Sequence, residues 1–447
     1  MFFNKLRFKI FIISMITSFC WLSGSAMPPA PKWTLEECVD YALQHSLEVR
    51  MLELSVKSKN VDLNTERNSW LPQISASASQ QYTFGRSLTY ENTYTNTSTG
   101  QTSVSLTGKM NLFDGFCSRY KKRMARDLVL VEKHNLADTK LTLIMNVAEA
   151  YLQVLMDMQL LEISERQVSI DSLQTLRLQG LLKHGKISYV DVVQQHATLQ
   201  SSMANASEKK NQLSTDELSL CQLMDLEVPK DFSIAKPKED DLCLMMPDNI
   251  DAILAEAINN YPTIQSQKAS ISCSEDKIKM CRSALYPQLS LVGGIGTNYY
   301  KTNGIDNRSF GNQLRNNFCQ EIQLQLTIPL FNRFETRNSI RQARIEKDKN
   351  EILLKKAKND LYHKITQIHA HAMNAYAKIT SYTATVNSNQ ESFKLTTKKY
   401  ECGKATLFEF DDSKVKLLEA ESSRLQALLD YYYQCYLLKL YKNPREI

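Results

Sequence analysis

The sequence predicts a mostly α-helical protein that also contributes four β-strands to a membrane β-barrel and that is built from two internal repeats. Three observations predict this fold. Two long segments lack helix breakers, four short segments alternate between apolar and polar residues, and several landmarks recur about 218 residues apart. We therefore expect long antiparallel helical hairpins that form an α-helical barrel, together with strands that close into a β-barrel only when chains associate.

A secretory signal peptide is expected over residues 1–26. A basic start precedes an apolar run from Ile10 to Leu22 and a small-residue segment that ends at Ala26, which is the layout of a cleaved leader. About 13 apolar residues are too few for a membrane anchor, which needs about 20. A lipoprotein leader with lipidated Cys20 is the alternative, although the bulky Phe19 before it fits that reading poorly.

The charge balance argues against a nucleic-acid partner. The net charge of +6 falls to +3 once Lys5, Arg7 and Lys9 leave with the leader, and the charged residues are spread along the chain. Nucleic-acid-binding proteins usually carry a concentrated basic face instead.

Two halves of the chain, 27–227 and 249–447, are expected to repeat one structure, with a polar, proline-bearing linker at 228–248. The segment "LPQIS" at Leu71 is echoed by "YPQLS" at Tyr286, and "NLFDGF" at Asn111 by "PLFNRF" at Pro329. Each half should run helix, strand, strand, long helix, turn, helix.

The strands are expected at about 73–84, 102–113, 288–300 and 320–331. From Ile74 to Phe84, for example, apolar or aromatic side chains largely occupy even positions, and serine, glutamine and threonine occupy odd ones. A period of two suits a strand that has lipid on one face and water on the other. A soluble β-sandwich hairpin is the alternative, but four strands among so much helix would make a poor sandwich.

The long helices are expected from about Phe116 to Leu182 and from about Phe334 to Tyr400. Neither segment contains proline, and the only glycine is Gly180, near the end of the first. A helix of this length spans roughly 100 Å, and so long a run indicates coiled-coil packing.

Each long helix should end in a tight turn, at 183–188 and at 401–406. The sequences are "KHGKISYVD" and "ECGKATLFE". Gly185 and Gly403 can take the left-handed conformation that ends a helix. Ser188 and Thr406 suit the N-cap of the next helix, and Asp191 and Glu409 follow three residues later, where an acid reaches back to the cap. Each turn therefore predicts an antiparallel helical hairpin.

Four strands cannot close a barrel, because the smallest common barrels have eight. Three copies of the chain would supply twelve strands, and their six helical hairpins would all end at the same level. The repeated turns would then form a ring at the mouth of a tube.

The mature sequence resembles the TolC family of outer-membrane efflux channels. The resemblance rests on "WTLEECVDYALQHSLEV" from Trp33, the two strand starts, "NLFDGF" and "PLFNRF", and the paired turns. It implies a homotrimer in the outer membrane of a Gram-negative bacterium, with a twelve-stranded barrel among the lipids and an α-helical tunnel in the periplasm. Such a protein is the passive exit duct for small molecules in a tripartite pump, joined to an inner-membrane pump by a periplasmic adaptor.

The resemblance also implies roles for residues at the turns. The adaptor is expected to dock on the hairpin tips, at Gly185, Lys186, Ser188, Gly403, Lys404 and Thr406. Glu409 and Asp412 match acids that narrow the pore, and Tyr400 with Asp191 matches a latch that holds the tip closed. A basic residue expected two positions after the second glycine is replaced by Ala405, and Lys404 is the candidate substitute.

Two other functions stay open at this point: the exit duct of a type I protein secretion system, and a coiled-coil structural protein of the envelope that is not a channel. An enzyme is not expected, since the sequence contains no phosphate loop, nucleophile elbow or zinc helix motif. His363, His369 and His371 lie close together in sequence, but His369 and His371 would point apart on a helix. We therefore expect neither a metal nor a cofactor.

Overall fold

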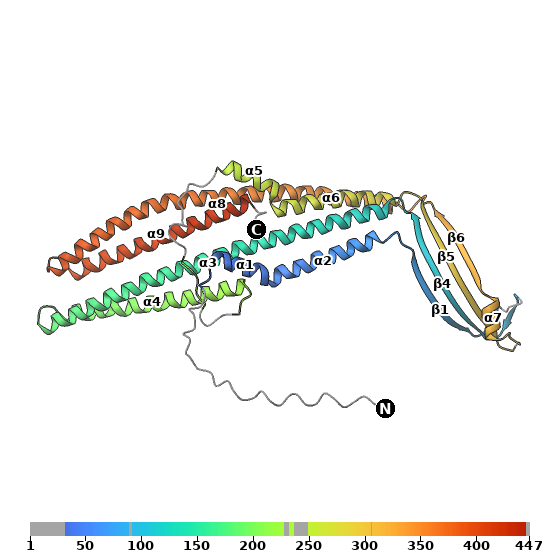
Figure 1. Cartoon of the computed structure of the whole chain (residues 1–447), viewed down its shortest axis with the longest axis horizontal. Helices are drawn as coiled ribbons and strands as arrows, with labels where there is room; N and C mark the ends of the chain where they lie inside the picture. Colours follow the sequence, from blue (N-terminus) through green and yellow to red (C-terminus); the bar gives the residue numbers. More distant parts are fainter. Residues whose placement is uncertain (1–31, 89–91, 228–231, 237–248, 305, 444–447) are drawn as a thin grey trace, which may run out of the picture.

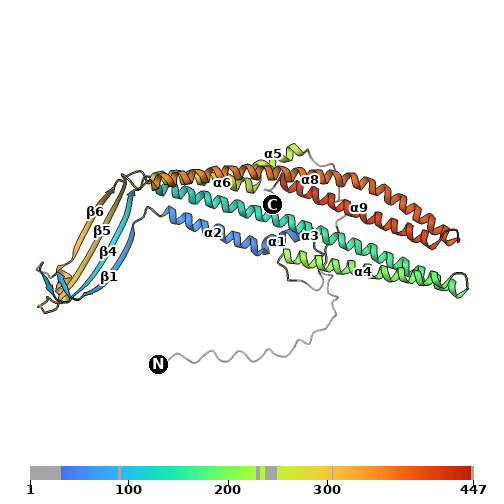
Figure 2. The same cartoon turned by 180° about the vertical axis from the view of Figure 1, so that it is seen from behind.

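The chain is elongated, with a β-sheet at one end and two helical hairpin tips at the other (Figures 1 and 2). The computed structural model describes residues 32–88, 92–227, 232–236, 249–304 and 306–443. The expected signal peptide at 1–26, including Cys20, and most of the expected linker at 228–248 lie outside the described residues.

The four expected strands are present and form one antiparallel sheet in the order β1-β4-β5-β6. Their bounds are β1 Gln73–Thr83, β4 Thr99–Phe113, β5 Gln288–Thr302 and β6 Cys319–Thr327. The central pair, β4 and β5, brings the two halves of the chain together and pairs Thr99 with Thr302. The predicted strands are therefore confirmed to within a few residues at most ends.

Among the described residues of one chain, both edges of this sheet are unpaired and its apolar face is uncovered. Ile74 on β1 is 67% exposed, and Ile322 on β6 is 86% exposed. Side chains of this kind at this density are found against lipid or another protein chain, not against water. Open strand edges likewise require partners.

Two connections that we expected to be loops contain short elements. β2 (Arg86–Leu88) and β3 (Tyr94–Asn96) form a hairpin after β1, and α7 (Phe310–Asn316) lies between β5 and β6. Their sequences are rich in Thr, Asn and Gly, so composition alone indicated a loop.

The long helices are confirmed. α3 (Cys117–Lys183) and α8 (Glu335–Glu401) each have 67 residues, and each is followed by a shorter helix, α4 (Tyr189–Leu223) and α9 (Leu407–Lys442). Figure 1 shows that both hairpins run in the same direction, away from the sheet.

A pair of helices, not one helix, precedes the first strand of each half. These are α1 (Leu35–His45) with α2 (Leu47–Arg67), and α5 (Ile250–Asn260) with α6 (Pro262–Ser283). Ser46 caps α2 through a hydrogen bond from the Val49 amide, and Pro262 is the first residue of α6. Both are helix-start residues. α2 and α6 pack beside α3, and α6 also packs beside α8. No described helix has a stretch that is long and apolar enough to cross a membrane.

The core lies midway along the helices, where the short helices α1 and α5 cover the long ones. Cys38 and Ala42 of α1 are buried against Val147 and Tyr151 of α3. The Tyr151 hydroxyl donates a 2.7 Å hydrogen bond to the carbonyl of Ala235, so the described piece of the linker is fixed to this layer.

A buried acid between α3 and α4 predicts a pH-dependent stability. Burial beside Asp216 raises the pKa of Asp157, which is 3% exposed, from 3.8 to about 7. A raised carboxyl pKa means that the folded state holds the proton more tightly, so the free energy of unfolding falls as pH rises from about 4 to about 7. We expect Asp157→Asn to raise this free energy by about 1–2 kcal/mol at pH 7.5 and to flatten its pH dependence in urea unfolding.

The exposed acid Glu208 of α4 provides a matched control for that measurement. Glu208→Gln should leave the pH profile unchanged. If the free energy of unfolding of Asp157→Asn depends on pH in the same way as that of the unaltered protein, the raised pKa does not belong to Asp157.

Candidate functional site at the helical hairpin tips

Each hairpin tip is a glycine turn with the same backbone hydrogen bonds. Gly185 has φ 69° and Gly403 has φ 70°. The Lys186 amide donates to the Leu181 carbonyl at 3.0 Å, and the Lys404 amide donates to the Lys399 carbonyl at 2.8 Å. This is the Schellman pattern, which ends a helix with a left-handed residue.

The N-caps that follow the two glycines are also as expected. Ser188 and Asp191 form a capping box at the start of α4, and Thr406 and Glu409 form one at the start of α9. The Thr406 amide donates to the Glu409 carboxylate at 2.7 Å. The predicted helix stop and helix start are therefore confirmed in both hairpins.

The outer surface of the tips combines lysines with exposed apolar residues that sequence reasoning did not single out. Lys186 and Lys404 are exposed, and neither side chain forms an ion pair within the described ranges. Tyr189 is 70% exposed and Phe408 is 77% exposed, each in the first turn after its cap. Aromatic side chains exposed beside cations are typical of a protein-binding surface. Their position directly after each N-cap is the signal that could have identified them.

Glu409 and Asp412 lie one turn apart on α9 and are both exposed. Glu409 is held by its capping box, while Asp412 accepts a 2.6 Å hydrogen bond from Lys416. Residues three apart share one face of a helix. Two carboxylates are thus presented at the start of α9.

Tyr400 has a different partner from the one expected. Its hydroxyl accepts a 2.8 Å hydrogen bond from Gln174 of α3, and its ring stacks on Phe410. Asp191 is engaged by the amide of Ser188, and no hydrogen bond joins it to Tyr400 in the described part of the chain. The tyrosine therefore ties α8 to α3 through Gln174.

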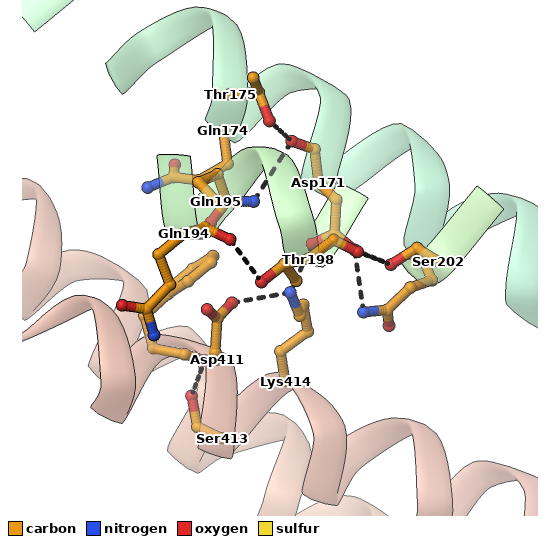
Figure 3. A network of polar contacts seen from close by, with 12 residues as sticks. Asp171, Gln174, Thr175, Gln194, Gln195, Thr198, Ser202, Asp411, Ser413 and Lys414 are labelled. Atoms are coloured by element: carbon orange, nitrogen blue, oxygen red, sulfur yellow. Dashed lines mark hydrogen bonds and ion pairs between the residues drawn. The ribbon is translucent and has the colours of Figure 1, made fainter. Parts of the chain in front are cut away.

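Behind the tips lies a buried ion pair that the sequence did not reveal. Lys414 of α9 is 1% exposed and Asp171 of α3 is 0% exposed. Their Nζ and Oδ1 atoms are 2.5 Å apart, and Lys414 also binds Asp411 at 2.8 Å (Figure 3). The second oxygen of Asp171 accepts hydrogen bonds from Ser202 of α4 and from Gln167. Each charged group in the cluster therefore has a partner, with one ammonium shared by two carboxylates.

Within the described residues, this ion pair is one of four polar links that join α3 to the second hairpin near the tips. The other three join Arg166 to Glu421 at 3.2 Å, Gln174 to Tyr400, and Arg177 to Glu401 at 3.7 Å. A further link, in which the Tyr433 hydroxyl donates to Glu149 at 3.1 Å, lies farther from the tips. The Arg177 guanidinium also lies 5.7 Å from the centre of the Tyr400 ring. Together these links hold the two hairpins of a chain side by side near their tips.

Within the described residues, no group of three His, Cys, Asp or Glu side chains lies close enough to hold a metal ion. This includes His363, His369 and His371 of α8. The described tip residues present exposed lysines, exposed aromatic side chains and two exposed carboxylates of α9.

Comparison with known proteins decides the family. A model of the outer membrane efflux protein family matches residues 38–225 and 253–437, which is most of the chain. The chain belongs to the outer membrane efflux protein family. This confirms the resemblance to the TolC family and decides against a structural coiled-coil protein. The protein is a transport protein of the outer membrane.

Individual relatives agree with this assignment. The probable efflux pump outer membrane protein TtgC of Pseudomonas putida is 21% identical over 394 residues, which cover 87% of this chain and 78% of TtgC. The outer membrane protein TolC of Salmonella enteritidis is 22% identical over 378 residues, with 83% and 73% covered. The crystal structure of the channel CusC shares the fold, with a TM-score of 0.78, 16% identity and 91% of each chain covered.

Proposed function

We propose that this protein is the passive exit duct of a tripartite efflux pump. Three copies would assemble into a twelve-stranded barrel in the lipid of the outer membrane and a continuous helical tunnel below it. Energy would come from an inner-membrane transporter, and a periplasmic adaptor would join that transporter to the hairpin tips.

The observation that carries this proposal is that one chain has an incomplete sheet at one end and two helical hairpins that both end at the opposite end. β1 and β6 are open edges at one end of the molecule, and the two glycine turns lie at the other (Figure 2). Three-fold association would satisfy both edges and give twelve strands, which is within the range of membrane barrels. It would place all six tips in one ring.

The tips have features suited to both docking and gating. Lys186, Lys404, Tyr189 and Phe408 offer an adaptor exposed charge and aromatic surface. Glu409 and Asp412 would place six carboxylates around the opening of a trimer, which favours cations. The four links between α3 and the second hairpin would hold that opening narrow, in place of the expected bond between Tyr400 and Asp191.

Small molecules are the proposed cargo. Relatives of this chain are named for the efflux of toluene, solvents or antibiotics. Export of proteins by a type I secretion system is the second candidate, and the docking surface would serve either system.

The docking role predicts that strained tips abolish efflux. Val at position 185 or 403 must adopt a left-handed backbone conformation that costs roughly 1 kcal/mol or more. We expect Gly185→Val/Gly403→Val to accumulate an efflux-substrate dye at nearly the level of a strain that lacks the protein. Dye accumulation in the encoding bacterium, with protein level and oligomer state measured in parallel, tests this.

Gly180→Val is the matched control, because Gly180 lies within α3 and an added Cβ there meets open space. This variant should export the dye normally. Normal dye export by the double tip variant would rule out docking at the glycine turns. Normal protein secretion with no dye export by the unaltered protein would favour the second candidate.

A further inference from the structure

A pocket lined by four arginines lies where the helices meet the sheet, far from the hairpin tips. Arg282 at the end of α6 and Arg337, Arg341 and Arg344 in the first turns of α8 surround a cavity of about 600 Å³. Leu285 and Tyr286, which lead from α6 into β5, line the side nearer the sheet. We define this cavity and its four cations as the arginine pocket.

The arginine pocket has no internal compensation for its charge. No acid lines it, and within the described ranges none of its four guanidinium groups forms an ion pair or a hydrogen bond to another side chain. Of the acids nearest in sequence, Glu346 lies 4.0 Å from Lys349, and Glu335 in the first turn of α8 does not line the cavity. All four arginines are exposed, so their guanidinium groups are free to bind an anionic ligand that enters the cavity.

The spacing of the arginines is that of one helix face. Positions 337, 341 and 344 follow steps of four and three, so their side chains project together from α8. Arg282 faces them from α6, which packs beside α8. The same level of α3 carries Arg119, Lys122 and Arg126, which are all exposed.

The arginine pocket also lies at a defined depth relative to the apolar surface. Phe331 is 72% exposed and Phe334 is 56% exposed, and they contact each other edge to face between β6 and α8. Arg337 and Arg341 follow Phe334 along α8 by roughly 5 and 10 Å. Along the molecule, the apolar strand comes first, then the aromatic residues, then the arginines. This order matches that of the hydrocarbon, the interface and the headgroups in a membrane leaflet.

We propose that the arginine pocket binds the headgroup of an anionic phospholipid in the periplasmic leaflet of the outer membrane. Guanidinium groups bind phosphate oxygens in pairs of parallel hydrogen bonds. Four of them suit a lipid with two phosphates, of the cardiolipin class, better than one with a single charge. The proposal rests on the membrane orientation described above and is independent of channel gating.

Lipid retention by the purified protein tests this proposal. The protein would be extracted in mild detergent, supplied with cardiolipin, phosphatidylethanolamine or inorganic phosphate, and examined by native mass spectrometry and thermal unfolding. We expect the protein to retain cardiolipin, and we expect cardiolipin, but neither phosphatidylethanolamine nor inorganic phosphate, to raise its unfolding temperature. Arg337→Gln/Arg341→Gln/Arg344→Gln should weaken cardiolipin binding at least tenfold.

A control with the same loss of charge is available further along α8. Lys355→Gln/Lys356→Gln/Lys364→Gln removes three exposed lysines of that helix and should retain cardiolipin fully. Equal retention by both triple variants would overturn the proposal, as would equal stabilisation by inorganic phosphate. A triple arginine variant that dissociates into monomers without added lipid would show instead that the pocket is a contact between chains. Conductance measured on the same samples separates failure of this inference from failure of the channel.

Discussion

Replacing Lys414 with methionine is expected to release the second hairpin from α3. The substitution leaves the carboxylate of Asp171 buried, at 0% exposure, without its cation. Breaking a buried pair in this way typically costs 3–5 kcal/mol. We therefore expect the amides near Lys414 in α9 to lose hydrogen-exchange protection by about 100-fold or more, since 1.4 kcal/mol corresponds to a factor of ten.

Two further variants make this result specific. Asp171→Leu/Lys414→Met removes the fully buried pair together and should recover much of the lost protection, because the one carboxylate that then lacks its cation, Asp411, is partly exposed to water. Lys416→Met breaks the exposed pair with Asp412 and should change the free energy of opening by less than about 1 kcal/mol. Equal exchange in Lys414→Met and Lys416→Met would show that the buried pair does not hold the hairpins together.

Neutralising the two acids at the start of α9 is expected to change the ion selectivity of the channel. Glu409→Gln keeps the capping box, because glutamine also serves at that position, and Asp412→Asn keeps the side-chain shape. In a trimer the double variant removes six negative charges from the mouth. We expect a larger conductance and a potassium-to-chloride permeability ratio that falls from several-fold toward about one, measured from reversal potentials in a potassium chloride gradient.

The control for this prediction removes two acids elsewhere in the first hairpin. Glu165→Gln/Glu208→Gln replaces exposed residues of α3 and α4 and should leave the reversal potential unchanged. A selectivity that stays the same in Glu409→Gln/Asp412→Asn would assign Glu409 to helix capping alone.

The features predicted correctly from the sequence are those that local chemistry determines. A glycine, a hydroxyl residue and an acid at fixed spacing specify the turns at Gly185 and Gly403, and all their hydrogen bonds lie within a few residues. The period of two in the strands and the absence of helix breakers in α3 and α8 are likewise local. The break between α1 and α2 could also have been predicted, because Ser46 is a good N-cap. We expected one helix there, because the residues on both sides of Ser46 favour a helix.

The contacts that could not be predicted join residues far apart in the sequence. Asp171 and Lys414 are 243 residues apart, and Gln174 and Tyr400 are 226 apart. The residues that immediately flank Asp171 do not identify Lys414 as its partner. One weak signal exists: Ser164, Asp171 and Leu178 continue the buried stripe of α3 at heptad spacing, which places polar residues where apolar ones are expected. Such a stripe indicates a buried polar network and leaves its partner unknown.

Single-channel recording of the purified, unaltered protein in a planar lipid bilayer tests the central claim most directly. If three chains form a continuous duct that narrows at the acidic tips, the protein should give discrete openings of small conductance that select for cations. Protein that is shown to be folded and trimeric but that gives no conductance in the bilayer would contradict the account.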